Sequence, residues 1–419
     1  MASISPIELA REIRDACLAG RRPEASWVRL LVEQAAAPDP ETAEHASQAL
    51  FRDVVEALAD RFEPELCVRY AEFFAQALTH ILPELDEHAL IERYQRLRQR
   101  RPYNPGRPAP ERIYVLSRVT LGADIAISSV ILDGLKRRFP NADLYFAGPR
   151  KNWELFARDR RILHLPVEYS RNGTLRDRVL AGWRLREQFS DPRCLVVDPD
   201  SRITQLGLLP ICDEDRYFFF ETRGYAPESS ASLTQLTQYW MAETFGVVDA
   251  VPYLAPEEDG AEQARGMVTV SFGVGENPAK AMGTEFEARL LAALVERGLH
   301  VLVDLGASPS DRHRAEQAIA ASGVDRRHIT TWEGSFAPFA ARIARSRLYV
   351  GYDSAGSHAA AASRVPLVVI FRGHVCERMY QRWQPTGSGP RRVIRVEDEP
   401  WQVVLGRTLS YAEEFLTRH

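Results

Sequence analysis

Lysine is scarce in this chain of 419 residues, in which only Lys136, Lys151 and Lys280 occur and arginine supplies the other basic side chains. Acidic residues slightly outnumber the basic ones, and the formal net charge is −4. Such a balance provides no overall basic surface of the kind that binds nucleic acid, so we expect no nucleic-acid partner. The scarcity also makes Lys280, which follows a glycine-containing loop, conspicuous.

The chain also lacks a long apolar run and a paired set of cysteines. No apolar run approaches the roughly 18 residues that cross a bilayer, and the polar N-terminus does not resemble a signal peptide. The five cysteines are scattered and show no CxxC spacing, which argues against a disulfide framework or a zinc site. We therefore expect free thiols in a reducing compartment, a cytoplasmic protein and no transmembrane segment. The cysteines are Cys17, Cys67, Cys194, Cys212 and Cys376.

Residues 1–100 have the apolar periodicity of helices and predict an all-helical N-terminal domain. Leu9, Ile13 and Cys17 recur at helical spacing after a Ser-Pro start. Residues 101–110 are rich in Pro, Gly and Arg and predict a linker. The role of the helices stays open, because they could shape a binding site of the following domain, form an oligomer contact or dock a partner protein.

From residue 111 onward, short apolar runs alternate with amphipathic helices, which indicates parallel sheets with helices on both faces. The alternation occupies 111–250, pauses in an acidic, proline-containing linker at 247–266 and restarts in 266–395. These segments predict two Rossmann-like domains, and residues 396–419 predict a final helix. The predicted strands are 112–119, 142–148, 162–167, 193–199, 266–273, 299–306, 328–332, 347–353 and 366–371.

Residues 351–371 read GYDSAGSHAAAASRVPLVVIF and place an acid, an imidazole and small side chains between a strand and a helix. Ligands of open parallel sheets bind at the carboxyl ends of the strands. Asp353 or Ser354 could cap the helix, whose free N–H groups would attract an anion. The small residues would let a diphosphate approach the backbone, and His358 could donate to a phosphate oxygen. An ordinary N-cap beside a surface histidine fits the same pattern.

This stretch resembles the signature of the heptosyltransferase family, glycosyltransferase family 9, whose usual form is D-[ST]-G-x-x-H-x-A-A-A followed by proline and an apolar strand. The departure is Ala355 where glycine is common, with Gly356 next. The resemblance covers about residues 111–419. It implies an α/β fold of the GT-B type, with two Rossmann-like domains that face a cleft and a last helix that returns to the first, acceptor-side domain. It assigns nucleotide-sugar binding to Ser271, Gly275, Lys280, Asp353, Ser354, Ala355, Gly356, Ser357 and His358.

Two further segments carry the resemblance. Residues 268–283 resemble the first strand and loop of the family's C-terminal half, where a lysine contacts donor phosphate, and Lys280 matches it. A solvated loop lysine is the alternative. Residues 117–146 resemble the N-terminal strand, loop and helix, where the family has Gly-Asp with the aspartate as catalytic base. This chain has one residue more between the two, which makes Asp124 the best match for the base and a helix-capping aspartate the alternative.

The loop at 196–210 follows a strand where the family has an aspartate-containing acceptor-side loop. A structural turn suits this loop equally well. The sequence Asp198-Pro199-Asp200 has the DxD form, but it lies in the half expected to hold the acceptor, so we expect neither a metal site nor a cofactor. The acceptor-side candidates are Thr120, Gly122, Asp198, Asp200, Arg202 and Gln205.

The resemblance thus implies a metal-independent, inverting glycosyltransferase with ADP-heptose as the favoured donor. The acceptor stays open between a glycan, a protein and a small molecule. One alternative is a non-catalytic GT-B scaffold that acts through its helical domain. A nucleotide-sugar epimerase or a phosphorylase of the same fold is another.

Overall fold

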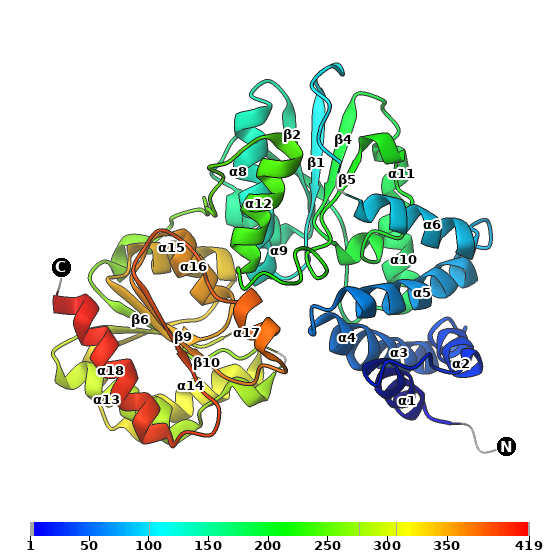
Figure 1. Cartoon of the computed structure of the whole chain (residues 1–419). Coiled ribbons are helices and arrows are strands. Elements are labelled where there is room, and N and C mark those ends of the chain that lie inside the picture. Colours follow the sequence, from blue (N-terminus) through cyan, green and yellow to red (C-terminus); the bar gives the residue numbers. More distant parts are fainter. Residues whose placement is uncertain (1–3, 100, 276, 307, 418–419) are drawn as a thin grey trace.

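Figure 1 shows the computed structural model, which describes residues 4–99, 101–275, 277–306 and 308–417. The chain forms two α/β halves, each built around one sheet, together with a helical region at its N-terminal end. In this view the first half stands above both the second half and the helical region. No helix within these ranges is long and apolar enough to cross a membrane.

The helical region, residues 4–99, contains helices and no strand. Its first helix begins with a reciprocal cap, because the Ser5 hydroxyl accepts from the Glu8 amide and the Glu8 carboxylate accepts from the Ser5 amide. The helices are α1 (Pro6–Leu18), α2 (Ala25–Ala35), α3 (Pro40–Gln48), a π-helical segment (Ala49–Glu56), α4 (Ala57–Ala59), α5 (Pro64–Ile81) and α6 (Glu87–Arg98).

The helical region and the first half share one apolar core. Tyr70, Phe74 and Leu78 of α5 are buried in the same cluster as Leu209 and Phe219 of the first half. Burial of apolar surface contributes about 25 cal/mol per Å², so this cluster holds the two parts together. The helical region is therefore packed against the first half and not only joined to it through the 101–110 segment.

The first half is a five-stranded, fully parallel sheet in the order β3-β2-β1-β4-β5. Its strands are β1 (Arg112–Leu116), β2 (Asp143–Gly148), β3 (Ile162–Pro166), β4 (Cys194–Asp198) and β5 (Tyr217–Phe219). Its helices are α7 (Leu121–Ala123), a π-helical segment (Asp124–Ser128), α8 (Ser129–Arg138), α9 (Arg150–Trp153), α10 (Leu175–Trp183), α11 (Leu185–Gln188) and α12 (Leu233–Phe245). The carboxyl ends of β1 and β4 therefore lie side by side at the centre of the sheet.

The second half is a six-stranded parallel sheet in the order β11-β10-β9-β6-β7-β8. Its strands are β6 (Val268–Ser271), β7 (Val301–Asp304), β8 (Ile329–Trp332), β9 (Leu348–Tyr352), β10 (Leu367–Phe371) and β11 (Arg391–Arg395). Its helices are α13 (Thr284–Glu296), α14 (Pro309–Ser322), α15 (Phe336–Arg345), α16 (Ala355–Ala362), α17 (Glu377–Arg382) and α18 (Trp401–Thr417). Two parallel-sheet halves are what the strand–helix alternation predicts.

The sequence does not predict β5 and β11, and each lies at an edge of its sheet. β5 has only three residues, and β11 reads RRVIR, so neither is an apolar run of ordinary strand length. Edge strands are commonly short or charged, because such features discourage pairing with another chain. Because β5 is short and β11 is charged, a search of the sequence for apolar runs does not find them.

The final helix, α18, packs on the second half, so the prediction that residues 396–419 return to the first half is wrong. Val404, Ala412 and Phe415 are buried in the apolar cluster of the second sheet. Arg392 of β11 also pairs with Glu414 at 2.7 Å. The apolar stripe of the helix matches the face of its own sheet, and Figure 1 shows α18 beside α13.

One apolar cluster joins all three parts of the chain. Phe62 of the helical region, Ala123 and Ile125 of the first half, and Ala359 and Met379 of the second half belong to it. The cluster includes residues of α16, whose first turn carries the family signature. The three parts therefore meet close to the predicted donor site.

Candidate functional site

The start of α16 lies directly after the carboxyl end of β9, a fully buried strand between β10 and β6. Ser354 is the N-cap residue, and the Ser357 hydroxyl donates to the Ser354 carbonyl at 2.7 Å. The first amide groups of a helix have no carbonyl partner within it, and the helix dipole adds a partial positive charge. The segment 353–358 thus forms the strand–helix junction that the sequence predicts, and its anion-binding role stays a prediction.

The ammonium group of Lys280 lies at this helix start. Lys280 ends a short 3-10 turn after β6, and its Nζ donates to Asp353 Oδ2 at 2.8 Å and to the Asp353 carbonyl at 2.9 Å. The Lys280 side chain is 16% exposed, compared with 6% for Asp353. Asp353 therefore holds the lysine and does not cap the helix, while part of the ammonium surface stays open.

His358 is buried in the first turn of α16, with its ring 6.0 Å from that of Trp383 in an edge-to-face arrangement. Burial lowers the pKa of His358 to about 4, an effect that Lys280 increases and Asp353 opposes. The imidazole is therefore neutral at pH 7. It can offer an N–H donor to a phosphate oxygen, but it adds no positive charge.

We expect His358 to make the chain less stable in acid. Its folded-state pKa of about 4 lies below the ordinary value of 6.5, so the unfolded chain binds an extra proton between these two values. The stability due to the neutral ring is fully present above pH ~6.5 and is lost as the pH falls toward 4, on the order of 2 kcal/mol between pH 7 and 5. Urea denaturation at pH 7 and pH 5 should show that His358→Gln loses less unfolding free energy between these two pH values than wild type does. Equal losses in the two proteins would contradict the prediction.

The small residues of α16 pack closely on the strand beneath. A Cβ on Gly356 would lie 2.4 Å from the hydroxyl oxygen of Tyr349, which is buried and has no hydrogen-bond partner among the described residues. Packing alone therefore accounts for this glycine. Ser271, at the end of β6, donates to Asp304 Oδ2 at 2.9 Å, and Gly275 has a φ of +60° in the loop that leads to Lys280.

The first half touches the start of α16 through the loop after β1. Val119 has a φ of +68°, a strained conformation for a β-branched residue. Thr120 and Gly122 are partly exposed, and a Cβ on Gly122 would lie 3.4 Å from His358 Cδ2 and 3.5 Å from Ala355 Cα. The two halves are thus in contact at the predicted donor site.

Asp124 does not face the space between the halves. It is fully buried at the start of the π-helical segment. Its two oxygens accept from Ser117 Oγ (2.7 Å), Arg118 N (2.7 Å), Ser128 Oγ (2.6 Å) and Asn152 Nδ2 (2.6 Å). Burial raises the pKa of Asp124, and these hydrogen bonds oppose the rise. This geometry contradicts the prediction that Asp124 is the catalytic base, because the carboxylate has no surface that an acceptor hydroxyl could reach. The extra residue after Gly122 directs the Asp124 side chain into the protein.

The acceptor-side candidates after β4 are also inside the protein. Asp198 accepts from the Ser201 amide at 2.6 Å, from Thr204 Oγ1 at 2.5 Å and from the Tyr217 hydroxyl, and burial raises its pKa to about 6. Gln205 has a φ of +51°, and its buried amide group has no partner among the described residues. Both residues shape the loop and offer no surface to an acceptor.

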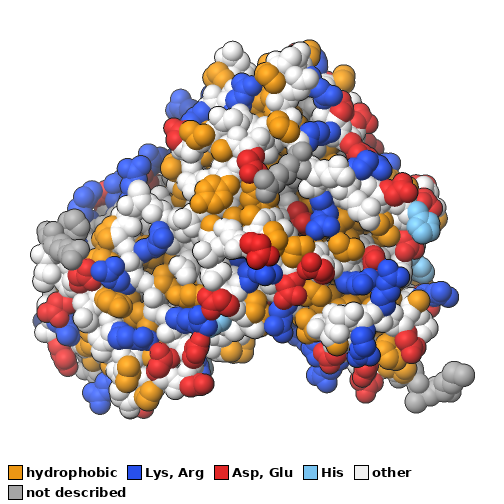
Figure 2. Space-filling model, in the orientation of Figure 1, with side chains coloured by type: hydrophobic (Ala, Val, Ile, Leu, Met, Phe, Trp, Pro, Cys, Tyr) orange, Lys and Arg blue, Asp and Glu red, His pale blue; other side chains and the backbone are white. Residues whose placement is uncertain are grey.

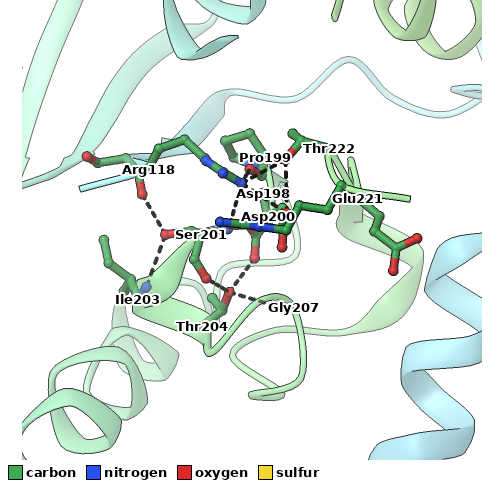
Figure 3. Close-up of polar contacts among 12 residues, drawn as sticks. Arg118, Asp198, Pro199, Asp200, Ser201, Ile203, Thr204, Gly207, Glu221 and Thr222 are labelled. Carbon is green, nitrogen blue, oxygen red and sulfur yellow. Dashed lines mark hydrogen bonds and ion pairs between the residues drawn. The ribbon is translucent and has the colours of Figure 1, made fainter. Parts of the chain in front are cut away.

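Asp200 forms a buried ionic group with two arginines (Figure 3). Its Oδ2 lies 2.5 Å from Arg223 Nη1 and 3.1 Å from Arg118 Nη1, and Arg118 also donates to the carbonyls of Pro199 and Asp200. The pKa of Arg118 falls to about 10 through burial, so the guanidinium stays charged at pH 7. Arg202 extends from the same loop to Glu56 of the helical region at 2.9 Å. Of the six acceptor-side candidates, Thr120, Gly122 and Arg202 keep some exposure.

No sequence pattern indicated the turn at 60–62, where the helical region reaches the second half. Arg61 donates to the Val375 carbonyl at 3.5 Å, and the Phe62 carbonyl accepts from Arg378 at 2.9 Å. The Phe62 ring lies 6.4 Å from that of Trp383, the same ring that faces His358. This turn is therefore a further wall of the candidate site.

Two cavities of the protein lie away from the start of α16. One of about 490 Å³ is lined by residues of α6, β5 and α12, and one of about 720 Å³ lies between the 101–110 segment, the amino end of β4 and the 213–218 segment. Neither contains Lys280 or a residue of α16. Within the described part of the chain, no three His, Cys, Asp or Glu side chains are grouped to hold a metal ion.

No family model and no curated protein matches the chain. The solved structures that resemble it include a glycosyl transferase family 9 protein from Veillonella parvula (14% identity, TM-score 0.57), the E. coli ADP-heptose LPS heptosyltransferase II (20%, 0.52) and the E. coli heptosyltransferase WaaC with ADP (14%, 0.51). The matches cover 73–74% of this chain and 98–99% of those chains. The chain has the GT-B fold of glycosyltransferase family 9.

The resemblance seen in the sequence is thus confirmed at the level of the fold. About a quarter of the chain lies outside each match, a share close to that of the helical region. The family 9 fold accounts for two parallel-sheet halves that meet at the carboxyl ends of their strands. At these low sequence identities, the structural similarity does not assign an activity to any residue of this chain.

Proposed function

We propose that the chain is a glycosyltransferase that takes its sugar from a nucleotide-sugar donor bound to the second half. The observation that carries this proposal is the placement of the Lys280 ammonium at the start of α16. An ammonium, free helix N–H groups and a neutral imidazole together suit a diphosphate. ADP-heptose is the first donor to test, because one resembling structure is described as using ADP-heptose and another contains ADP.

The chemistry follows from these groups. The acceptor hydroxyl gives its proton to a base or to water as its oxygen attacks the anomeric carbon, the bond from that carbon to the diphosphate oxygen breaks, and the nucleoside diphosphate leaves with the electron pair. Lys280 and the amides of α16 stabilise the charge that grows on the leaving oxygen, so the step needs neither a metal ion nor a cofactor. A single displacement inverts the anomeric centre.

A second candidate, a non-catalytic scaffold, is favoured by one observation. Gly122, at the end of the 119–122 loop, lies close to Ala355 and His358, where a diphosphate would bind. Donor binding therefore requires this loop to withdraw from α16. In a scaffold the contact would be permanent, and the helical region would supply the function through a partner.

The test is turnover of nucleotide sugars. The purified chain is incubated with ADP-, GDP-, UDP-, CDP- and dTDP-sugars and a mixture of glycan, peptide and small-molecule acceptors, and both the released nucleoside diphosphate and the mass increase of the acceptor are measured. A glycosyltransferase releases diphosphate in step with acceptor labelling, and Lys280→Ala lowers both. Absence of release with every donor would favour the scaffold.

A further inference from the structure

The helical region places a carboxylate, that of Asp60, beside the candidate donor site. Asp60 directly follows α4, and its carbonyl and that of Arg61 lie 3.8 Å from the Cys376 sulfur at the start of α17. The next residue, Phe62, packs edge-on against Trp383, which also faces His358. Asp60 thus lies where all three parts of the chain meet. In the view of Figure 2, acidic and basic side chains lie side by side above the notch between the helical region and the second half.

Asp60 is surrounded by groups of both charges. Burial raises its pKa and Glu56 adds to the rise, while Arg223, Arg202 and Lys280 oppose it. Glu56 comes from the preceding π-helical segment, the two arginines from the first half and Lys280 from the donor site. The contacts of the 60–62 turn with Cys376 and Trp383 bring Asp60 to the side of the donor site on which His358 lies.

The other carboxylates of this region are already engaged. Asp353 holds Lys280, Glu56 pairs with Arg171 and Arg202, and Asp124 and Asp200 are buried in their own networks. The Asp60 side chain is partly exposed and makes no hydrogen bond or ion pair within the described residues. A carboxylate that is close to the donor site, solvent-accessible and unpaired can accept a proton.

From this geometry we infer that Asp60 is the general base of the proposed transfer and that the helical region completes the active site. The inference rests on the proposed function. In the step, the Asp60 carboxylate removes the proton from the acceptor hydroxyl as the hydroxyl oxygen bonds to the anomeric carbon. The bond from that carbon to the diphosphate breaks, the electron pair leaves with the diphosphate, and the proton on Asp60 then passes to water.

The test compares Asp60→Asn, Asp60→Glu and wild type with the nucleotide sugar that wild type turns over. For Asp60→Asn, kcat should fall about 10²–10⁴-fold, the range for loss of a general base, with the Kd for the nucleoside diphosphate changed by less than about twofold. Asp60→Glu should recover part of kcat. In wild type kcat/KM should fall in acid as Asp60 is protonated, and Asp60→Asn should lose this dependence.

Glu63→Gln is the matched control, because Glu63 lies three residues further on and has no side-chain bond that caps α5. It should leave kcat unchanged, and melting curves show whether each variant folds. Wild-type turnover with equal kcat in Asp60→Asn would overturn the base assignment and leave the proposed function standing. If wild type neither binds a nucleoside diphosphate nor turns over a nucleotide sugar, the proposed function is wrong, and the assignment of Asp60 as its general base is wrong as well.

Discussion

Replacing Asp124 by alanine is expected to lower the free energy of unfolding by about 3–5 kcal/mol, because four buried donors would lose their acceptor. The donors are the hydroxyls of Ser117 and Ser128, the Arg118 amide and the Asn152 side-chain amide. No other group in the network replaces the carboxylate, and solvent does not reach it. Urea denaturation monitored by circular dichroism would measure the change.

Ser128→Ala is the control for this prediction, since it removes one of the four donors and leaves the carboxylate with three. We expect it to cost about 1 kcal/mol, the usual contribution of one hydrogen bond. A stable but inactive Asp124→Ala would contradict the structural role and return Asp124 to the position of catalytic base. An unstable Asp124→Ala fits the buried network described here.

Replacing Lys280 by alanine is expected to weaken nucleoside diphosphate binding about 10–100-fold, which corresponds to about 1.4–2.8 kcal/mol. Two effects add. The variant lacks the ammonium that would contact the phosphates, and it leaves the Asp353 carboxylate unpaired beside them, so that like charges repel. Calorimetric titration with ADP, GDP, UDP, CDP and dTDP measures the change for whichever nucleotide wild type binds.

Lys151→Ala is the matched control, because Lys151 is an exposed lysine on α9 of the first half. It should bind the nucleotide as wild type does. Lys280→Ala/Asp353→Asn should recover part of the lost affinity, since the second change removes the repelling charge. Unchanged binding in Lys280→Ala would mean that the diphosphate does not lie at the start of α16.

Most of the strands predicted from the sequence are buried on both faces of their sheets, and such strands must be apolar throughout. β4 and β9 are examples. The edge strands β3 and β8 were also predicted, although their side chains are partly exposed. The edge strands β5 and β11 were not predictable in this way, and the position of α18 depends on which apolar face it fits. A periodic pattern reveals that a helix has an apolar stripe but not which surface covers it.

The donor side of the site was predictable because its residues are close together in sequence. The segment 353–358 forms one strand–helix junction, and the other candidates, Ser271, Gly275 and Lys280, all come from the end of β6 and the loop that follows it. The acceptor side was not predictable. Asp124 differs from the family pattern by one residue, and a shift of one position in a helical turn directs the side chain inward. Asp60 comes from a region that the family pattern does not include, so only the fold brings it to the site.

The most direct measurement is a crystal structure of the chain with the nucleoside diphosphate that binds most tightly. We expect the diphosphate oxygens to lie within hydrogen-bond distance of Lys280 Nζ and of the first amides of α16, with the 119–122 loop displaced from Ala355. A diphosphate bound in another place, such as the cavity lined by Arg96, Arg98 and Arg101, would contradict the donor site.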